Sequence, residues 1–279
     1  MKSEAGGFRA FDFSFSVRMP SSALARWLDH VLSALASGSD AEHRYELDAA
    51  GRLCLDGDPL VTGSTIRHGV EQLLWHINQR AVASLPANAV LHAAAVSRNG
   101  IGVILPAPME SGKTTLATAL VLAGFGYLTD EAVSFDVDSL DVLPFPKPLS
   151  IDRGAWRLFP ELEPRLDRAI TGAVPDQWQV APDDIRPGAT AASCHPSILV
   201  FPRRDHERPT SLVPIGRGMA VRLLAQNCFR FRDQGRRLLP VLADVARHCE
   251  CYVLDVDDVD TAVELVTKVT DAAVASVSR

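Results

Sequence analysis

The chain has 279 residues, of which 47% are apolar and 22% are charged, and its formal net charge is −6. This composition is typical of a globular protein with one large domain or two small ones. The negative net charge argues against a broad nucleic-acid surface, so we expect no nucleic-acid partner.

Targeting and redox signals are weak throughout the sequence. No apolar run approaches the roughly 18 residues that a membrane span needs, and the first residues, MKSEAGGFRAFDF, lack a continuous apolar segment of the signal-peptide type. The five cysteines include no C-x-x-C pair, so neither a disulfide framework nor a standard zinc site is indicated. The stretch His248–Cys251 is interpreted as the start of an apolar strand rather than a metal site. We therefore expect a cytoplasmic protein without a membrane partner.

Residues 1–86 predict an N-terminal α+β region without a chemical motif. Ser64 is placed to cap its last helix, and Pro86 to stop it. The region either completes the fold or recognises a substrate. Its expected elements are a strand at 8–18, a helix at 22–36, two short strands at 43–60 around Ala-Gly and Asp-Gly turns, and a helix at 64–84.

Residues 87–279 predict a second, α/β domain. Two apolar strands surround a turn at Asn99-Gly100, and Gly124 is placed to end the helix that follows them. The expected elements are strands at 89–96 and 101–105, a helix at 114–123, a strand pair within 127–138, a long loop or flap at 171–196, a strand at 197–201, helices at 218–231 and 236–248, a strand at 251–256, and a helix at 258–276.

The sequence LPAPMESGKTT, residues 105–115, lies between an apolar strand and a helix. This is the context of a phosphate-binding loop, in which a glycine and the helix N-terminus present N–H groups to an anion. Lys113 would contact the β- and γ-phosphates, and the Thr114 hydroxyl would ligate Mg²⁺. The residues expected to bind nucleotide are Pro108, Met109, Glu110, Ser111, Gly112, Lys113, Thr114 and Thr115.

Two residues depart from the usual loop pattern. Ala107 stands where a glycine is usual, and alanine is tolerated there only if φ stays negative. Glu110 adds a negative charge close to where phosphates would lie. Only its backbone N–H need face the nucleotide, so we expect its carboxylate to point to solvent or to a basic substrate.

An acidic pair, Asp130-Glu131, follows 17 residues after Lys113, and His92 precedes Lys113 by 21 residues. This pattern resembles the HPr kinase/phosphorylase family, especially its HPr-kinase-like relatives. The similarity covers roughly residues 88–256. It is most specific at 91–136, and VPIGRGMAVRLLAQNCFRF (213–231) adds a second match. The resemblance implies a P-loop α/β kinase core related to phosphoenolpyruvate carboxykinase, with residues 1–86 as an N-terminal α+β extension.

The resemblance also implies residue roles. Asp130 matches the base that takes the proton of a substrate serine, and Glu131 stands near the metal and phosphates. His92 matches a histidine beside the acidic pair, and Arg217 a loop arginine that contacts the reacting phosphate. Thr114 and Glu131 are thus the expected metal residues. Two adjacent acids repel each other unless a cation lies between them, and Mg²⁺, a protonated histidine or an arginine would serve.

Two departures limit the resemblance. PFPKPLSIDRGAWRLF (144–159) replaces the Glu-Ile-Arg-Gly type stretch of the family, so reverse phosphorolysis is not expected. Arg217 lies in Gly-Arg-Gly rather than Pro-Gly-Arg-Asn, so substrate docking is expected to differ, and HPr itself is not assumed as the substrate.

The leading hypothesis is an ATP- and Mg²⁺-dependent kinase that phosphorylates a Ser or Thr hydroxyl of a protein or peptide. Two alternatives stay open: a nucleotide-binding switch or assembly module without catalysis, and a small-molecule kinase. The resemblance suggests self-assembly into a homo-oligomer.

Each residue also has a simpler interpretation. Asp130-Glu131 would be a solvated turn, His92 a core histidine and Arg217 a surface residue. The acidic run LDVDDVD (254–260) resembles a Walker B motif but is interpreted as a strand end followed by helix N-terminal acids.

Overall fold

The computed structural model is a mixed α/β structure and describes residues 3–38, 40–63, 65–136, 138–164, 176–205 and 207–277. The chain divides into two compact units, Met1–Pro86 with Lys147–Asp184, and Ala87–Pro146 with Ile185–Arg279. The division after Pro86 lies where the sequence pattern separates residues 1–86 from residues 87–279. Residues 147–184 group with the first unit instead of with the region that follows residue 86.

The first unit contains a five-stranded sheet in the order β1-β2-β3-β4-β5, in which only the β2–β3 pair is parallel. Two helices, α1 (Ser22–Val31) and α2 (Ile66–Ala83), contact this sheet. The strands are β1 (Ser3–Ala10), β2 (Phe13–Met19), β3 (His43–Leu47), β4 (Leu53–Leu55) and β5 (Asp58–Val61). Residues 147–184 add the strand pair β11 (Leu149–Asp152) and β12 (Gln177–Val180), the 3-10 helices η2 (Arg153–Leu158) and η3 (Pro160–Leu162), and the first residues of α5 (Pro182–Ile185).

Three predictions for the first unit need correction. The single strand expected at 8–18 is a hairpin, in which Ala10 and Phe13 pair across a turn where Phe11 takes a left-handed φ of 53°. Ala10 and Phe13 are both buried although three positions separate them, so the alternation of buried and exposed residues changes phase at the turn. Residues 43–60 hold three strands rather than two. Ser64 lies outside the described residues, and the side chain of Thr65 accepts the capping bond from the N–H of His68 at the start of α2.

The second unit is built on an eight-stranded sheet, counted over the described residues, in the order β10-β9-β6-β7-β13-β15-β14, with β8 also paired to β6. Strands β7, β13 and β15 run parallel, as buried strands flanked by helices do. The strands are β6 (Val90–Arg98), β7 (Ile101–Pro106), β8 (Gly126–Thr129), β9 (Ala132–Phe135), β10 (Val142–Leu143), β13 (His195–Arg204), β14 (Ser211–Pro214) and β15 (Glu250–Val256).

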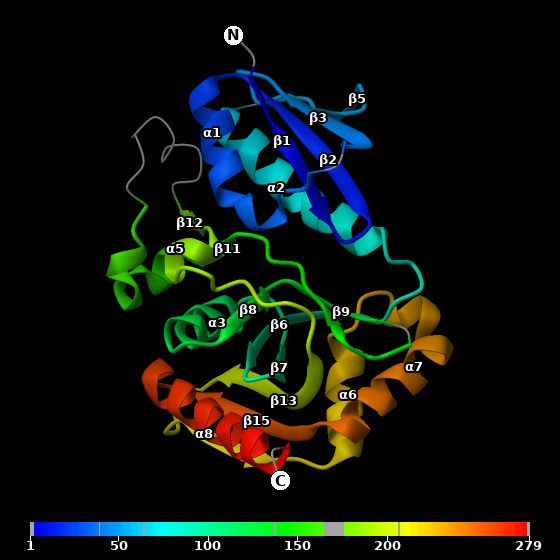
Figure 1. The fold of residues 1–279 in the computed structure, drawn as a ribbon, viewed down its shortest axis with the longest axis vertical. Coiled ribbons are helices and arrows are strands. Elements are labelled where there is room, and N and C mark those ends of the chain that lie inside the picture. The colour runs from blue at the N-terminus through cyan, green and yellow to red at the C-terminus, as the bar shows by residue number, and fades with distance from the viewer. Residues whose placement is uncertain are drawn as a thin grey trace. The chain divides into compact units, whose positions relative to one another are not determined.

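Helices cover both faces of this second sheet (Figure 1). Helix α3 (Lys113–Leu122) packs against β6 and against α8 (Val259–Val277), which also contacts β7. Helices α6 (Arg217–Gln226) and α7 (Phe231–His248) share a buried cluster with Leu91, Ala93 and Ala95 of β6. Because side chains alternate along a strand, these odd-numbered residues point away from the face that carries their even-numbered neighbours.

The turns of the central hairpin and of α3 agree with the sequence. Asn99 and Gly100 have φ values of 50° and 82° and connect β6 to β7, as the Asn-Gly pair predicts. Gly124 follows α3 with a φ of 97°, which confirms its predicted role as the residue that ends the helix. The segment expected to form a strand pair within 127–138 does form β8 and β9, although both pair with β6 rather than with each other.

The predicted flap at 171–196 is largely structured, although its residues 171–175 lie outside the described ranges. It contains β12 and α5, and its last part is held along β8. The N–H of Tyr127 donates to the carbonyl of Ala189 at 2.7 Å, and the N–H of Ala191 donates to the carbonyl of Tyr127 at 2.9 Å. Backbone pairing of this kind makes residues 189–191 an extension of the sheet.

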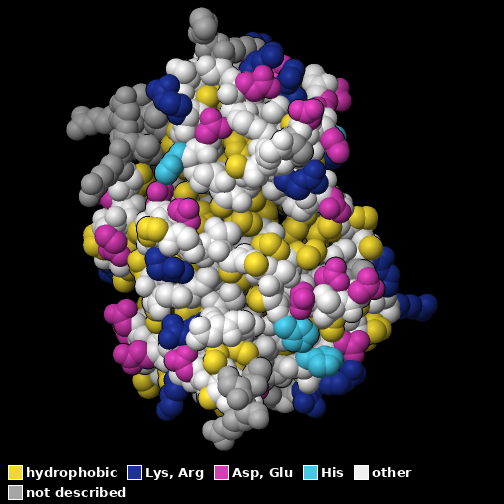
Figure 2. All heavy atoms as spheres, in the orientation of Figure 1, with side chains coloured by type: hydrophobic (Ala, Val, Ile, Leu, Met, Phe, Trp, Pro, Cys, Tyr) yellow, Lys and Arg dark blue, Asp and Glu magenta, His cyan; other side chains and the backbone are white. Residues whose placement is uncertain are grey.

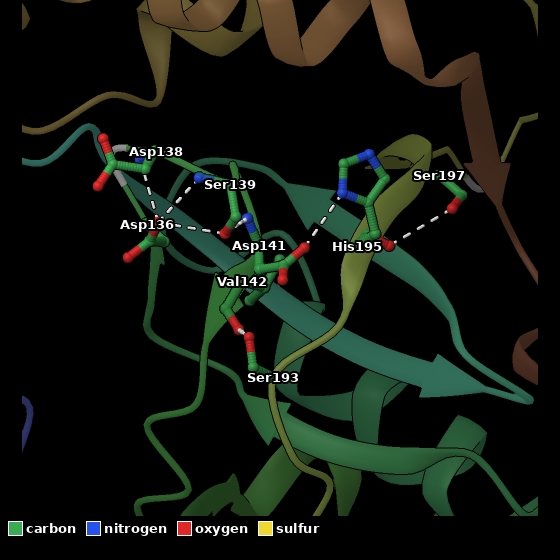
Figure 3. Close-up of polar contacts among 8 residues, drawn as sticks. All are labelled: Asp136, Asp138, Ser139, Asp141, Val142, Ser193, His195 and Ser197. Atoms are coloured by element: carbon green, nitrogen blue, oxygen red, sulfur yellow. Dashed lines mark hydrogen bonds and ion pairs between the residues drawn. The ribbon is translucent and has the colours of Figure 1, made fainter.

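Further contacts bind the same segment to the β9–β10 hairpin (Figure 3). The Ser193 hydroxyl donates to the carbonyl of Val142 at 2.9 Å, and the His195 ring Nδ1 lies 3.1 Å from Asp141 Oδ1. Asp136 Oδ1 accepts from the N–H of Ser139 at 2.9 Å and closes the turn of the hairpin. The segment 189–195 is therefore bonded to β8 at its start and to the β9–β10 hairpin at its end.

The visible face of the molecule mixes charges of both signs. Figure 2 shows Lys and Arg side chains scattered among Asp and Glu side chains over this face. No helix among the described residues is both long and apolar enough to cross a membrane. The expected absence of nucleic-acid and membrane partners stays a prediction.

Gly102 of β7 provides a test of the central packing. A Cβ at this position would lie 2.6 Å from the backbone carbonyl oxygen of His195, where β7 and β13 approach closely. We expect Gly102→Ala to lower the free energy of unfolding by about 1–3 kcal/mol, because backbone must shift to admit the methyl group. Urea denaturation measures this change.

Gly218 of α6 is the matched control, because a Cβ there meets nothing within 4 Å. Gly218→Ala should leave stability unchanged or raise it by up to about 1 kcal/mol through better helix propensity. Equal effects of the two substitutions would contradict the close approach of β7 and β13.

Candidate functional site

The segment 105–115 folds as the sequence predicts, with a strand, a loop and a helix in succession. β7 ends at Pro106, and α3 begins at Lys113 with Gly112 as its N-cap at a φ of 86°. Ala107 is buried and does not have a positive φ, which explains why alanine is accepted there. Glu110 is exposed, as expected, and takes a left-handed φ of 61° that a side chain adopts at a cost of about 1 kcal/mol.

Lys113 is buried, with 6% of its surface exposed. Its Nζ donates to the carbonyl oxygens of Ala107 at 2.9 Å and Pro108 at 2.7 Å. Burial lowers the pKa of Lys113 to about 8, while the negative charges of Glu131 and Asp130 act in the opposite direction. The two carboxylates therefore lie within electrostatic reach of the lysine, and the loop holds a cation that has few water contacts.

Asp130 is the best-connected carboxylate of the site and is buried, with 3% of its surface exposed. The Thr114 hydroxyl donates to its Oδ2 at 2.8 Å, and the Tyr127 hydroxyl donates to its Oδ1 at 2.8 Å. These contacts rule out the interpretation of Asp130 as part of a solvated turn. They also join the start of α3 to the end of β8, so two motifs 17 residues apart in sequence meet in one cluster.

Glu131 occupies the turn between β8 and β9 and is half-buried. Its N–H donates to Thr129 Oγ1 at 3.2 Å, and its carbonyl accepts from the N–H of Ala93 at 3.3 Å. These backbone bonds fix the turn against β6. Its side-chain charge acts on Lys113 and opposes the lowering of the lysine pKa by burial.

His92 lies on β6 beside this cluster. Burial lowers its pKa to about 4, and the positive charge of Lys113 lowers it further, while Asp130 opposes the change. This pKa favours a neutral imidazole at pH 7, so among the cations considered for the acidic pair a protonated His92 is not the one that this environment favours. The predicted role of His92 stays a prediction. Its backbone N–H donates to the carbonyl of Asn227 at 2.7 Å, which ties β6 to the end of α6.

Arg217 is not brought to this cluster. It is the exposed first residue of α6, directly after β14, and β13 and β15 lie between β14 and β7 in the sheet. The opposite end of the ten-residue α6 is the one that contacts β6, at Asn227, and such a helix spans about 15 Å. The charge of Arg217 acts instead on Cys251, whose pKa is raised mainly by burial. Its contact with a reacting phosphate stays a prediction.

Tyr127 is the residue of the cluster that the sequence reasoning missed. It is fully buried, and its hydroxyl donates directly to Asp130. A signal was present, because a tyrosine in a buried strand needs a hydrogen-bond partner for its hydroxyl, and the nearest acid follows three residues later. The strand pattern alone does not show which way the ring points.

The cluster fits a magnesium nucleotide by the chemistry of its donors. Mg²⁺ prefers oxygen ligands and usually keeps waters and substrate phosphates in its shell. The Thr114 hydroxyl and the Glu131 carboxylate are the oxygen donors that would be available to such an ion, and no group of three or more His, Cys, Asp or Glu in the described chain could hold a metal by itself. Ser111 Oγ is buried and lacks a hydrogen-bond partner, so it remains available to a ligand in the loop.

The acidic run 254–260 and the cysteines of the stretch 248–251 have structural partners of their own. Asp255 Oδ2 accepts from Arg203 Nη2 at 3.0 Å, and Asp258 Oδ1 accepts from the N–H of Thr261 at 2.8 Å at the start of α8. This confirms their interpretation as a strand end and helix N-terminal acids. Cys249 and Cys251 are buried against the sheet, as expected for small apolar residues.

Comparisons with known proteins give little beyond these residues. No family model matches the chain, and no curated protein matches it. One similar solved structure is the HPr(Ser) kinase/phosphatase from Coxiella burnetii, with 15% sequence identity and a TM-score of 0.29. The similarity covers 43% of this chain and 62% of that chain. A TM-score this low does not establish a shared fold.

The burial of Lys113 gives a testable dependence of stability on pH. Its pKa in the folded chain, about 8, lies below its ordinary value of 10.5, so the unfolded chain binds more protons between these values. The contribution of Lys113 to stability therefore rises as the pH increases through this window. We expect Lys113→Arg to lack this rise, because a guanidinium stays charged.

Urea unfolding midpoints of the wild-type chain and Lys113→Arg, measured from about pH 7.5 to pH 10, provide the comparison, because charges elsewhere contribute equally to both. The side-chain ¹³C resonance of Lys113, identified by its absence from the variant, should titrate near pH 8. Parallel stability curves together with an unshifted titration would contradict the buried position of Lys113.

Proposed function

We propose that the chain is an ATP- and Mg²⁺-dependent kinase that transfers the γ-phosphate to a Ser or Thr hydroxyl of a protein or peptide. The observation that carries the proposal is the buried cluster in which the loop hydroxyl of Thr114 bonds to Asp130 beside Lys113. Phosphoryl transfer needs positioning and charge neutralisation more than covalent help from the protein. A hydroxyl bonded to a carboxylate, with a lysine whose charge interacts with that carboxylate, meets those needs.

The chain's own residues divide the work by their chemistry. Lys113, released from the carbonyls of Ala107 and Pro108, binds the β- and γ-phosphates, and the N–H groups at the start of α3 bind the remaining phosphate oxygens. Thr114 and Glu131 would hold Mg²⁺, which when bound neutralises phosphate charge. His92, with a pKa lowered to about 4, adds no net charge at pH 7.

Asp130 is the proposed base. The acceptor oxygen loses its proton to the Asp130 carboxylate and forms a bond to the γ-phosphorus, while the bond between that phosphorus and the bridging oxygen breaks and ADP leaves. The hydrogen bond from Thr114 also supports a second role for Asp130, since a carboxylate that accepts from the threonine hydroxyl orients it toward the metal. The two roles predict different losses when the carboxylate is neutralised.

One observation favours a switch as the alternative function. Two of the three N–H donors of Lys113 Nζ go to the loop's own carbonyls, so a phosphate that takes over either of these donors would exchange it away from the loop. Such an exchange makes the loop conformation depend on the nucleotide, which is the property that a nucleotide-dependent switch or assembly module requires. Transfer of phosphate separates this alternative from a kinase.

The test is transfer of labelled γ-phosphate from ATP into a lysate of the source organism, with and without Mg²⁺. We expect a labelled protein band with the wild-type chain, and loss of at least about 100-fold in rate with Asp130→Asn and with Lys113→Ala. Nucleotide affinity, measured by calorimetry, should survive Asp130→Asn and be lost in Lys113→Ala. Glu264→Gln, which removes an exposed carboxylate on α8, serves as the control.

The pattern of losses assigns the role of Asp130. A base gives loss of transfer at every Mg²⁺ concentration, whereas a metal-orienting carboxylate gives a loss that excess Mg²⁺ partly restores. Nucleotide binding without any labelled protein would support the switch, or a small-molecule acceptor if ATP is consumed. Failure of the wild-type chain to bind nucleotide would overturn the proposal.

A further inference from the structure

We propose that Tyr127 is a positioning residue that holds the Asp130 carboxylate in one orientation, an inference that rests on the proposed function for its kinetic consequence. The Tyr127 hydroxyl donates to Asp130 Oδ1, and the Thr114 hydroxyl donates to Asp130 Oδ2, each at 2.8 Å. With one donor on each oxygen, rotation of the carboxylate about its Cβ–Cγ bond breaks both bonds. A carboxylate has about four lone-pair positions, so acceptor capacity remains for the proton of a substrate.

The backbone around Tyr127 is unusually well fixed. On one side it pairs with Val96 of β6, and on the other its N–H and carbonyl bond to Ala189 and Ala191 at 2.7 Å and 2.9 Å. Gly126, the preceding residue, lets this segment approach, because a Cβ there would lie 2.8 Å from the Cβ of Ala191. A strand bonded along both edges aims its side chain more reproducibly than a loop does.

The phenol is also chemically restricted to donating. Tyr127 is fully buried, and burial together with the adjacent Asp130 charge raises its pKa well above the ordinary value of 10.0. The Tyr127 hydroxyl is the donor in its bond to Asp130 Oδ1, and this is the role that holds the carboxylate. A buried hydroxyl without an acceptor costs about 1–3 kcal/mol, which keeps the bond to Asp130 closed. Thr114 differs, since this residue is only half-buried.

A positioned base affects turnover more than binding. The carboxylate must lie within hydrogen-bond distance of the acceptor hydroxyl, and displacements of about 1 Å cost up to 100-fold in rate. On this proposal nucleotide is bound by the loop and the start of α3, whereas the hydroxyl of Tyr127 bonds to the Asp130 carboxylate. Loss of the phenol oxygen should therefore lower kcat and leave the KM for ATP nearly unchanged.

The experiment is Tyr127→Phe, which keeps the ring and removes the oxygen. We expect kcat to fall about 10- to 100-fold with the KM for ATP within about twofold of wild type. Tyr252→Phe is the matched control, because the Tyr252 hydroxyl also donates to a carboxylate, Glu250, at 2.6 Å, but on β15 away from the loop. It should leave both parameters unchanged.

A second readout does not depend on activity. The side-chain carboxyl ¹³C resonance of Asp130, assigned by its absence in Asp130→Asn, should move in Tyr127→Phe and stay in place in Tyr252→Phe. If the Asp130 resonance moves in Tyr127→Phe but the wild-type chain transfers no phosphate, the positioning role stands and the kinase is rejected. An unmoved resonance with unchanged kcat would overturn the positioning role and leave the kinase intact.

A double-mutant cycle covers the case in which Tyr127→Phe folds poorly. Urea unfolding of the wild-type chain, Tyr127→Phe, Asp130→Asn and the double variant measures whether the two side chains act together. We expect the double variant to be clearly more stable than the sum of the two single losses predicts. Strict additivity would show that the hydroxyl does not act on the carboxylate, and would overturn the inference.

Discussion

The burial of the Lys113 ammonium is the constraint on which the second unit depends. Desolvation lowers its pKa to about 8, and the structure offsets that cost with two backbone carbonyls and two nearby carboxylates. Each of these partners needs its own support, because buried carboxylates are as costly as a buried lysine. The hydrogen bonds from Thr114 and Tyr127 to Asp130 are that support. Each charged group of the cluster is thus stabilised by the next: the carboxylates offset the charge of Lys113, and the two hydroxyls offset the burial of Asp130.

The sheet supplies the rigidity that this compensation requires. β6 pairs with β7, β8 and β9, so the strand before the loop, the strand of Tyr127 and the strand after the acidic turn are all bonded to it. His92 belongs to β6 as well, and its backbone bond to Asn227 brings the end of α6 to the same strand. Groups held on neighbouring strands stay within hydrogen-bond distance without help from a ligand.

Local sequence patterns predicted the structure correctly where adjacent residues decide the backbone geometry. Gly112-Lys113-Thr114 between an apolar strand and a helix predicted the strand–loop–helix geometry, and Asn99-Gly100 and Gly124 predicted their turns. The acidic pair was found from its spacing to Lys113. Patterns failed where distant segments compete, at the hairpin within 8–18 and at residues 189–191, which pair with β8. Each failure depends on pairing partners that the local sequence does not contain.

The sequence by itself determined which groups are present and which neighbours they have along the chain: a phosphate-loop pattern, an acidic pair and a histidine at fixed spacings. Only the tertiary structure decided that Thr114, Asp130 and Tyr127 share one buried network, that His92 is neutral, and that Arg217 stands apart from them. The physical reason is that burial and charge proximity set both hydrogen bonding and protonation. Both are properties of the space around a side chain, which folding creates from segments far apart in sequence.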